Sequence, residues 1–161
     1  MTRSITFAIS HEAAVPIGGA AERWFGQRRN GGAAGEPVVL DIGGTQADLL
    51  LWIGVERLAI GAGGDGAALL CNFAAPQPEA DEEFNDWYDT EHLPRLAAVP
   101  GVLTAQRFMA ECGSPPYLAL YGLADPAVAQ SSAWREAAAT PWTARIKRYT
   151  ARFESFLFTR R

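Results

Sequence analysis

The sequence predicts an α+β fold in which a β-α-β-β-α-β unit spans residues 67–161 and a β-rich region of residues 1–66 precedes it. Three observations lead to this prediction. Residues 81–101 have the pattern of an amphipathic helix that ends in a proline-bounded turn. Strand-like apolar segments flank this helix, and a second helical segment carries two proline-containing helix starts. A chain of 161 residues is long enough for one well-buried core or for two small units.

The first predicted helix has an aromatic face with an ionisable edge. Phe84, Tyr88 and His92 recur every four residues, and Trp87 with Glu91 forms the neighbouring row. Acidic residues crowd the first turn, where the positive end of the helix dipole favours carboxylates. We therefore expect the function of the chain to be centred on Tyr88, Glu91 and His92.

The order of the elements after residue 66 is typical of a ferredoxin-like sheet with helices on one side. The second helical segment begins at Asp125-Pro126 and is broken at Thr140-Pro141, because each pair supplies a capping side chain and a proline in the first turn. The predicted strands are residues 67–74, 102–111, 117–123 and 155–159, and the second helical segment is residues 126–153.

The region before residue 67 is predicted to be rich in strands. Residues 4–10 alternate like a short strand, and residues 20–29 are interpreted as a short helix. Residues 38–55 are predicted to form a β-hairpin, because glycines in the connection tolerate the positive φ angles of a tight turn. The glycine-rich segment 61–66 is the predicted domain boundary. This order leads to the hypothesis that residues 1–66 are a degenerate half-repeat that replaces part of a partner's sheet.

A single four-stranded sheet that is covered on one face leaves the other face open. Two helices cannot satisfy all of a set of five strand residues, so a large apolar surface is expected to remain; the set is Leu70, Arg107, Met109, Phe156 and Phe158. Pairing with a second copy of the chain would bury this surface. We therefore predict a homodimer.

Composition and charge exclude several classes of protein. The chain is 48% hydrophobic and 20% charged, which is typical of globular proteins. Its net charge of -4 argues against sequence-independent nucleic-acid binding, which requires an excess of Lys and Arg. No segment approaches the ~20 consecutive apolar residues of a membrane helix, and the N-terminus lacks a secretory signal pattern. We therefore expect a cytoplasmic protein without membrane contact, in which Cys71 and Cys112 are reduced and form no metal site.

Three segments resemble one known family. They are FNDWYDTEHLPRLAAVPGVLTAQRF from residue 84, PYLALYGLADP from residue 116 and SSAWREAAATPWTARI from residue 131. The chain from about residue 67 to residue 161 is similar to the EthD-like and stress-responsive members of the dimeric α/β-barrel superfamily. This resemblance implies a homodimeric ferredoxin-like fold with a pocket between the sheet and the first helix. It also implies that a helix histidine, His92 in this chain, faces that pocket.

The resemblance implies a class of chemistry as well. Relatives with this fold include small cyclases, lactone isomerases and monooxygenases that act without a metal on polyketide-like or aromatic molecules. Other members have no known activity. The expectation for this chain is therefore a small apolar or aromatic ligand and no cofactor.

A second resemblance lies before the boundary. The segment VVLDIGGTQADLLLW at residues 38–52 is similar to the first phosphate-binding hairpin of sugar kinases in the actin-like ATPase superfamily, with Asp41, Gly43, Gly44 and Thr45 in the turn. That fold needs two domains and further nucleotide motifs, for which 161 residues leave no room. A short hairpin with a glycine turn explains the same residues.

His92 and Tyr88 are the predicted catalytic residues. A histidine with an ordinary pKa near ~6.5 exchanges protons near neutrality, and Glu91 or Asp89 would tune it. Tyr88 lies one turn earlier and would orient a substrate oxygen through its hydroxyl group. In the structural alternative, His92 caps backbone carbonyls and Tyr88 belongs to the core.

The predicted ligand-binding residues are polar groups in apolar strands and aromatic groups near the helix. Polar side chains in such strands must be paired internally or must line a cavity. Arg107 is interpreted either as a partner of a substrate carboxylate or enolate, or as a salt bridge to an acid of residues 79–91. The aromatic residues suit a ring-bearing ligand or an ordinary core. The set comprises Glu91, Arg107, Trp87, Asn72, Tyr117, Tyr121 and Trp134.

These residues support two hypotheses of different classes. The first is a cofactor-independent enzyme that moves a proton next to a carbonyl group, as cyclisation and isomerisation require. The second is a stress-related or ligand-binding module without turnover. A haem-binding variant of the fold is a third hypothesis.

Overall fold

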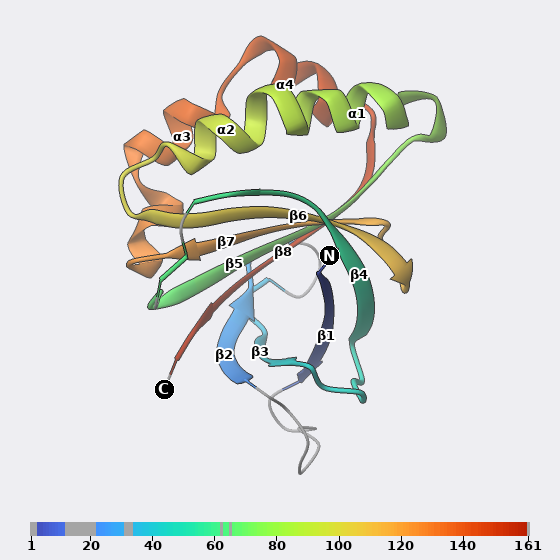
Figure 1. The fold of residues 1–161 in the computed structure, drawn as a ribbon, viewed down its shortest axis with the longest axis vertical. Coiled ribbons are helices and arrows are strands. Elements are labelled where there is room, and N and C mark those ends of the chain that lie inside the picture. The colour runs from blue at the N-terminus through green and yellow to red at the C-terminus, as the bar shows by residue number, and fades with distance from the viewer. Residues whose placement is uncertain (1–2, 12–21, 31–33, 62, 65, 161) are drawn as a thin grey trace.

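Eight strands close into one antiparallel barrel, and helices cover one side of it (Figure 1). The computed structural model describes residues 3–11, 22–30, 34–61, 63–64 and 66–160. The strands are β1 (Ser4–His11), β2 (Glu22–Arg28), β3 (Pro37–Ile42), β4 (Leu50–Ile60), β5 (Ala68–Pro76), β6 (Val102–Cys112), β7 (Tyr117–Leu123) and β8 (Thr150–Thr159). The helical segments are η2 (Pro78–Ala80), α1 (Asp81–Trp87), η3 (Tyr88–His92), α2 (Leu93–Ala97), η4 (Pro126–Gln130), α3 (Ser132–Ala138) and α4 (Pro141–Lys147).

The barrel consists of two four-stranded halves with the same strand order. Around the barrel the order is β1-β3-β2-β8-β5-β7-β6-β4, so the second half runs β8-β5-β7-β6 and the first half runs β4-β1-β3-β2. When the strands of each half are numbered from one to four along the chain, both halves have the order 4-1-3-2. The two halves meet where β2 pairs with β8 and where β4 pairs with β6. This repetition supports the proposal that residues 1–66 are a degenerate half-repeat.

Two predictions for the first half are wrong. The described part of the predicted helix 20–29 is strand β2, which pairs with β3 on one side and with β8 on the other. The predicted hairpin over residues 38–55 is absent, because β1 lies between β3 and β4 and pairs with both. Long-range ladders determine both outcomes, whereas the local pattern carries no information on which strands become neighbours.

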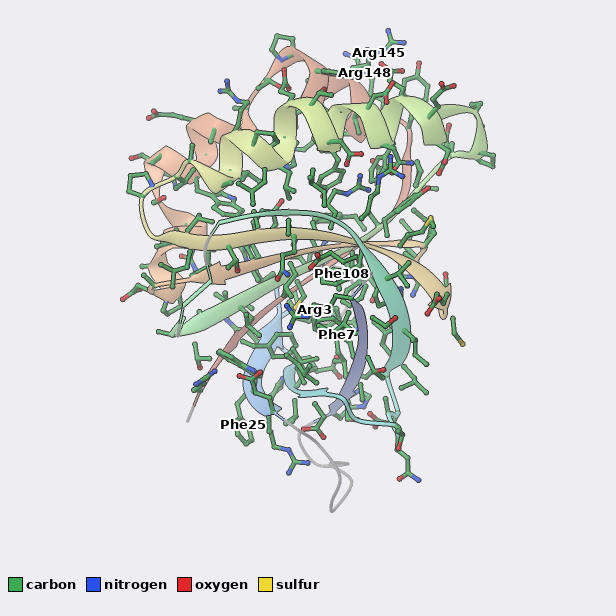
Figure 2. The ribbon with its side chains drawn as sticks, viewed as in Figure 1. Arg3, Phe7, Phe25, Phe108, Arg145 and Arg148 are labelled. Atoms are coloured by element: carbon green, nitrogen blue, oxygen red, sulfur yellow. The ribbon has the colours of Figure 1, made fainter. Side chains whose placement is uncertain are left out.

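The barrel interior is packed with aromatic side chains. Phe7 and Phe108 point into it in Figure 2, and the rings of Trp52 and Phe73 lie 5.8 Å apart in an edge-to-face contact. Phe156 and Phe158 are also fully buried there. The prediction that they would leave an open apolar face is therefore wrong, because β1–β4 of the same chain cover that face. The homodimer stays a prediction.

The helix layer lies on the outer side of the sheet formed by β5–β8 (Figure 1). The segments α1, η3 and α2 run on as one helix beside α3 and α4, and Arg145 and Arg148 extend from the solvent side of the layer (Figure 2). Strand β8 begins at Thr150, earlier than predicted, because pairing with β5 overrides the local helical pattern there. Within the described residues, no helix is long and apolar enough to cross a membrane.

The seam between β2 and β8 depends on a residue without a side chain. A Cβ atom at Gly26 would lie 2.0 Å from the carbonyl oxygen of Leu157 and 2.7 Å from Cα of Phe158. We expect Gly26→Ala to lower the free energy of unfolding by about 3 kcal/mol or more, because backbone atoms must move to admit the methyl group. Chemical denaturation measures this change.

Gly35→Ala is the matched control for this substitution. Gly35 has a φ of +86°, and nothing lies within 4 Å of the added Cβ, so this variant carries only backbone strain of about 1–2 kcal/mol. Equal destabilisation by the two substitutions would contradict the proposed closeness of the two halves at this seam.

Candidate functional site

A hollow lies between the helix layer and the sheet of β5–β8. This helix-side cavity has a volume of about 570 Å³ and is lined mainly by apolar and aromatic side chains. Five of the residues predicted from the sequence line it, namely Asn72, Trp87, Tyr88, His92 and Trp134. Glu91, Arg107, Tyr117 and Tyr121 are not among its lining residues.

A π-helical turn at Tyr88–His92 sets the direction of the two predicted catalytic residues. The amide of Leu93 donates to the carbonyl of Tyr88, five residues earlier. Pro94 has no amide hydrogen to continue the α-helical ladder, and the Thr90 hydroxyl donates to the Asp86 carbonyl at 2.7 Å. Both features favour a wider turn at this place.

The π-helical turn brings Trp87 and His92 onto the same face. In an α-helix, side chains five residues apart point in directions about 140° apart. Here the two rings are stacked, with centroids 4.1 Å apart and planes inclined by 26°. The four-residue spacing in the sequence predicted that His92 would lie next to Tyr88. These two rings are also in edge-to-face contact, with centroids 5.1 Å apart.

His92 is buried and carries no charge near neutral pH. Its exposed fraction is 9%, and its Nδ1 atom is buried without a hydrogen-bond partner in the described residues. Burial is the main reason that the pKa of His92 is lowered to about 3, and the positive charges of Lys147, Arg107 and Arg95 contribute to the same shift. The imidazole is therefore neutral, with one nitrogen able to donate and the other able to accept a hydrogen bond.

Tyr88 remains protonated beside His92. Burial raises the pKa of Tyr88 to about 12, although the positive charge of Arg107 acts in the opposite direction. The guanidinium carbon of Arg107 lies 4.3 Å from the centre of the Tyr88 ring. Tyr88 thus offers an O–H donor, and Arg107 packs against its ring.

Arg107 is part of a buried ion-pair network outside the cavity. Its side chain is fully buried, and Nη1 donates to Oδ1 of Asp89 at 2.7 Å. Arg57 binds the other oxygen of Asp89 at 2.8 Å. Of the two interpretations offered by the sequence, the structure shows the salt bridge, because Arg107 neutralises a helix carboxylate and does not reach the cavity lining.

Tyr117 extends the same network. The Tyr117 hydroxyl donates to Asp81 at 2.8 Å and accepts a hydrogen bond from Asn85 at 2.9 Å. The Asn85 side-chain oxygen in turn accepts from Arg107 at 3.1 Å. Tyr117 therefore helps to hold the start of α1 on the sheet, and it does not line the cavity.

Glu91 ends a chain of hydrogen bonds that orients Trp87. Trp87 Nε1 donates to the Thr143 hydroxyl at 3.2 Å, and the hydroxyl oxygens of Thr143 and Thr140 lie 3.0 Å apart. Thr140 donates to Glu91 at 2.5 Å, so its single proton is committed and Thr143 must donate to Thr140. The carboxylate of Glu91 thus accepts at the end of the chain, and Trp87 is held in position to stack on His92.

Of the remaining predicted residues, Asn72 and Tyr121 belong to strands β5 and β7, and Trp134 belongs to α3 in the helix layer. Asn72 accepts a hydrogen bond from the Ser155 hydroxyl at 2.7 Å, and both residues line the cavity. Trp134 lies over Tyr121 in an edge-to-face contact with ring centroids 5.0 Å apart. Tyr121 itself is fully buried behind Trp134.

Sequence reasoning missed two cationic residues of the cavity. Arg29 and Lys147 line it, and they come from the ends of β2 and α4. Arg29 fell within a predicted helix of the first half, and no local signal connects it to a cavity in the second half. No group of three or more potential metal-ligating side chains exists in the described residues.

Comparisons with known proteins show the fold of the chain. No family model and no curated protein matches the sequence. Among solved structures, the chain resembles a major regulator of staphylococcal pathogenesis (TM-score 0.61, 11% identity, 99% of this chain and 100% of that chain covered). It also resembles a heme-degrading enzyme from Listeria monocytogenes (TM-score 0.59, 9% identity, 99% and 100% covered).

A third similar structure carries the name of the fold. It is a ferredoxin fold protein related to antibiotic biosynthesis monooxygenases, from Listeria monocytogenes (TM-score 0.55, 9% identity, 98% of this chain and 94% of that chain covered). The chain has a ferredoxin-like α+β fold. Because the matches extend over nearly the whole chain, they include the closed barrel and both of its halves.

The neutral state of His92 predicts a pH dependence of stability. The pKa of His92 is lowered from 6.5 to about 3 in the folded state. As the pH falls below 6.5, His92 therefore becomes protonated in the unfolded chain but stays neutral in the folded chain. Relative to His92→Gln, the wild type should lose about 1.4 kcal/mol of stability per pH unit between about pH 6 and pH 4. Denaturation curves across this range measure the difference.

His11→Gln provides a control of opposite sign. Hydrogen bonding to Asp48 raises the pKa of His11, so its contribution to stability is present at low pH and is lost as the pH rises through the folded-state pKa. A wild type and a His92→Gln variant with parallel pH profiles would show that His92 is protonated normally in the folded state.

The hydrogen-bond chain behind Trp87 predicts a second effect on stability. Thr143→Val keeps the shape of the side chain and leaves Trp87 Nε1 without its acceptor, which should cost about 1–3 kcal/mol. Thr143→Ser retains the hydroxyl group and should cost less. Denaturation followed by tryptophan fluorescence compares the variants, and equal costs would mean that the hydroxyl of Thr143 does not hold Trp87.

Proposed function

We propose that this protein binds a small aromatic, oxygen-bearing molecule in the helix-side cavity and transfers a proton to or from it through His92. The reaction is of the cyclase, isomerase or monooxygenase type and needs no cofactor, as the EthD-like resemblance implies. The observation that carries the proposal is a neutral imidazole in the wall of a cavity of about 570 Å³, with a buried nitrogen that has no hydrogen-bond partner among the described residues.

The neutral form of His92 suits a proton shuttle. A neutral imidazole accepts a proton at one nitrogen and donates one from the other, so it can serve two atoms of a bound ligand. Its low pKa makes the free imidazole a weak base, because protonation would place a charge in a buried site and near Lys147, Arg107 and Arg95. An anionic ligand would relieve this penalty, since it supplies a compensating charge.

Tyr88 and Trp87 position the ligand and the imidazole. The Tyr88 hydroxyl is a permanent donor at neutral pH because its pKa is about 12, and it lies one turn before His92. In this proposal it binds an oxygen atom of the ligand while His92 accepts or donates the proton. Trp87 keeps the imidazole plane in place by stacking, so it acts as a positioning residue.

A second candidate function is ligand binding without turnover. One observation favours it. The described residues that line the cavity include no Asp or Glu, so acid-base catalysis would depend on His92. The pKa of His92 is about 3, which makes it a weak base at neutral pH. The heme-degrading relative raises the haem hypothesis again, which predicts a Soret band in the purified protein. A colourless protein would argue against haem and leaves the other two functions open to the next test.

Oxidation of 1,8-dihydroxyanthrone tests for catalysis. Its methylene group is acidified by the ring carbonyl, and loss of a proton permits reaction with dioxygen to give the anthraquinone and water. We expect the wild type to accelerate anthraquinone formation, followed by absorbance and oxygen uptake. His92→Gln should lose about 10²-fold or more of this acceleration, the usual contribution of a general acid-base group.

His11→Gln is the matched control, because His11 is not among the residues that line the cavity and pairs with Asp48 and Glu36. This variant should keep the wild-type rate. Binding of the anthrone, measured by quenching of Trp87 and Trp134 fluorescence, separates the two candidate functions. Binding without acceleration supports the non-catalytic module. The absence of both binding and acceleration would contradict both candidate functions for this ligand class.

A further inference from the structure

The helix-side cavity has a positive electrostatic bias. Arg29 and Lys147 line it, and the part of its wall that the structure describes contains no carboxylate. The chain as a whole has a net charge of -4, so this bias is local. Cations gathered around an apolar cavity attract ligands of opposite charge.

The first half of the chain delivers Arg29 to this cavity. The Arg29 amide donates to the Ser155 carbonyl at 2.7 Å, directly after β2 ends. The next residue, Asn30, extends the pairing through its side chain, which donates to the Phe153 carbonyl at 3.1 Å and accepts from the Ser155 amide at 2.8 Å. These bonds to β8 hold the backbone of Arg29 at the cavity edge.

The guanidinium group of Arg29 lacks an anionic partner in the described residues. Its Nη2 atom donates a hydrogen bond to the carbonyl of Ala129 at 3.3 Å, whereas a guanidinium has five N–H donors. Burial lowers the pKa of Arg29, as expected for a partly desolvated cation without a nearby carboxylate. By contrast, two other arginines near the helix layer have carboxylate partners: Arg107 is paired with Asp89 and Arg145 with Glu83.

A second cation faces the same space from the helix layer. Lys147 lies in the last turn of α4, lines the cavity and is near enough to His92 to lower its pKa. No ion pair of Lys147 occurs in the part of the chain that the structure describes. The two cations belong to different layers, one to the barrel and one to the helices.

We infer that the helix-side cavity selects aromatic ligands that carry a carboxylate or another anionic oxygen, with the anionic group bound by Arg29 and Lys147 and the ring packed against Trp87 and Trp134. This inference rests on the proposed function and names its ligand class. A planar anionic oxygen pair suits the guanidinium fork of Arg29. The aromatic wall supplies the apolar part of the binding energy.

An anionic ligand also changes His92. Its charge offsets Lys147 and Arg107, two of the cations that keep the imidazole neutral, and therefore raises the pKa of His92. The other groups that face this imidazole are Arg95, which is cationic, and the neutral Tyr88 and Trp87. A bound anion thus makes His92 a stronger base at the moment when a proton must be removed.

The test compares 2-naphthoate with 2-naphthamide, which have the same ring system and nearly the same shape. Isothermal titration calorimetry measures both affinities for the wild type, Arg29→Gln, Lys147→Gln and the control Arg145→Gln. Arg145 lies on the solvent side of the helix layer (Figure 2). We expect the wild type and the control to bind the carboxylate about 10- to 100-fold more tightly than the amide.

Arg29→Gln should remove most of this preference and leave the affinity for the amide unchanged, and Lys147→Gln should remove a smaller part. NMR should show a higher pKa of His92 with 2-naphthoate than with 2-naphthamide. Equal affinities of the two ligands for the wild type would overturn the anionic ligand class and leave the proposed function standing. Absence of binding by either ligand would overturn both, and a preference that survives in both variants would overturn the roles of Arg29 and Lys147.

Discussion

The structure depends on closing the barrel within one chain. The sheet of β5–β8 has two faces that exclude water, and the helix layer can cover only one of them. Strands β1–β4 cover the other, through the ladders of β2 with β8 and of β4 with β6. Without them, Phe73, Phe156 and Phe158 would lie in solvent, at a cost of about 2 kcal/mol or more for each ring. The inner face is therefore lined by buried aromatic side chains, and the helix-side cavity lies on the opposite face of the sheet.

The C-terminal half could be predicted from the sequence because its signals are local. The spacing of Phe84, Tyr88 and His92 is the pattern of a helix face, and the proline-containing caps mark the later helices directly. The first half could not be predicted in this way. The position of β1 between β3 and β4, and the strand conformation of β2, depend on partners far away in the sequence.

The candidate site shows the same division. His92, Tyr88 and Trp87 lie on one helix, so the sequence places them together, but the stacking of His92 on Trp87 depends on a π-helical turn that an ideal helical wheel does not contain. Arg107 was a sound candidate, because it is an arginine in an apolar strand. Whether it faces a ligand or a carboxylate is a matter of register, and the register places it against Asp89. Arg29 could not be found from local pattern, because its neighbours in space are Ser155 and Ala129.

The acidic helix explains how a chain of net charge -4 can hold a positively biased cavity. Asp81 is bound by Tyr117, Asp89 by Arg107 and Arg57, Glu83 by Arg145, and Glu91 by Thr140. Each of these carboxylates is turned toward the sheet edge, the neighbouring helix or solvent, and none lines the cavity. The aromatic residues of the same helix occupy the inward face. Arg29 and Lys147 consequently have no carboxylate beside them among the described residues that line the cavity, which is why the proposed ligand is an anion.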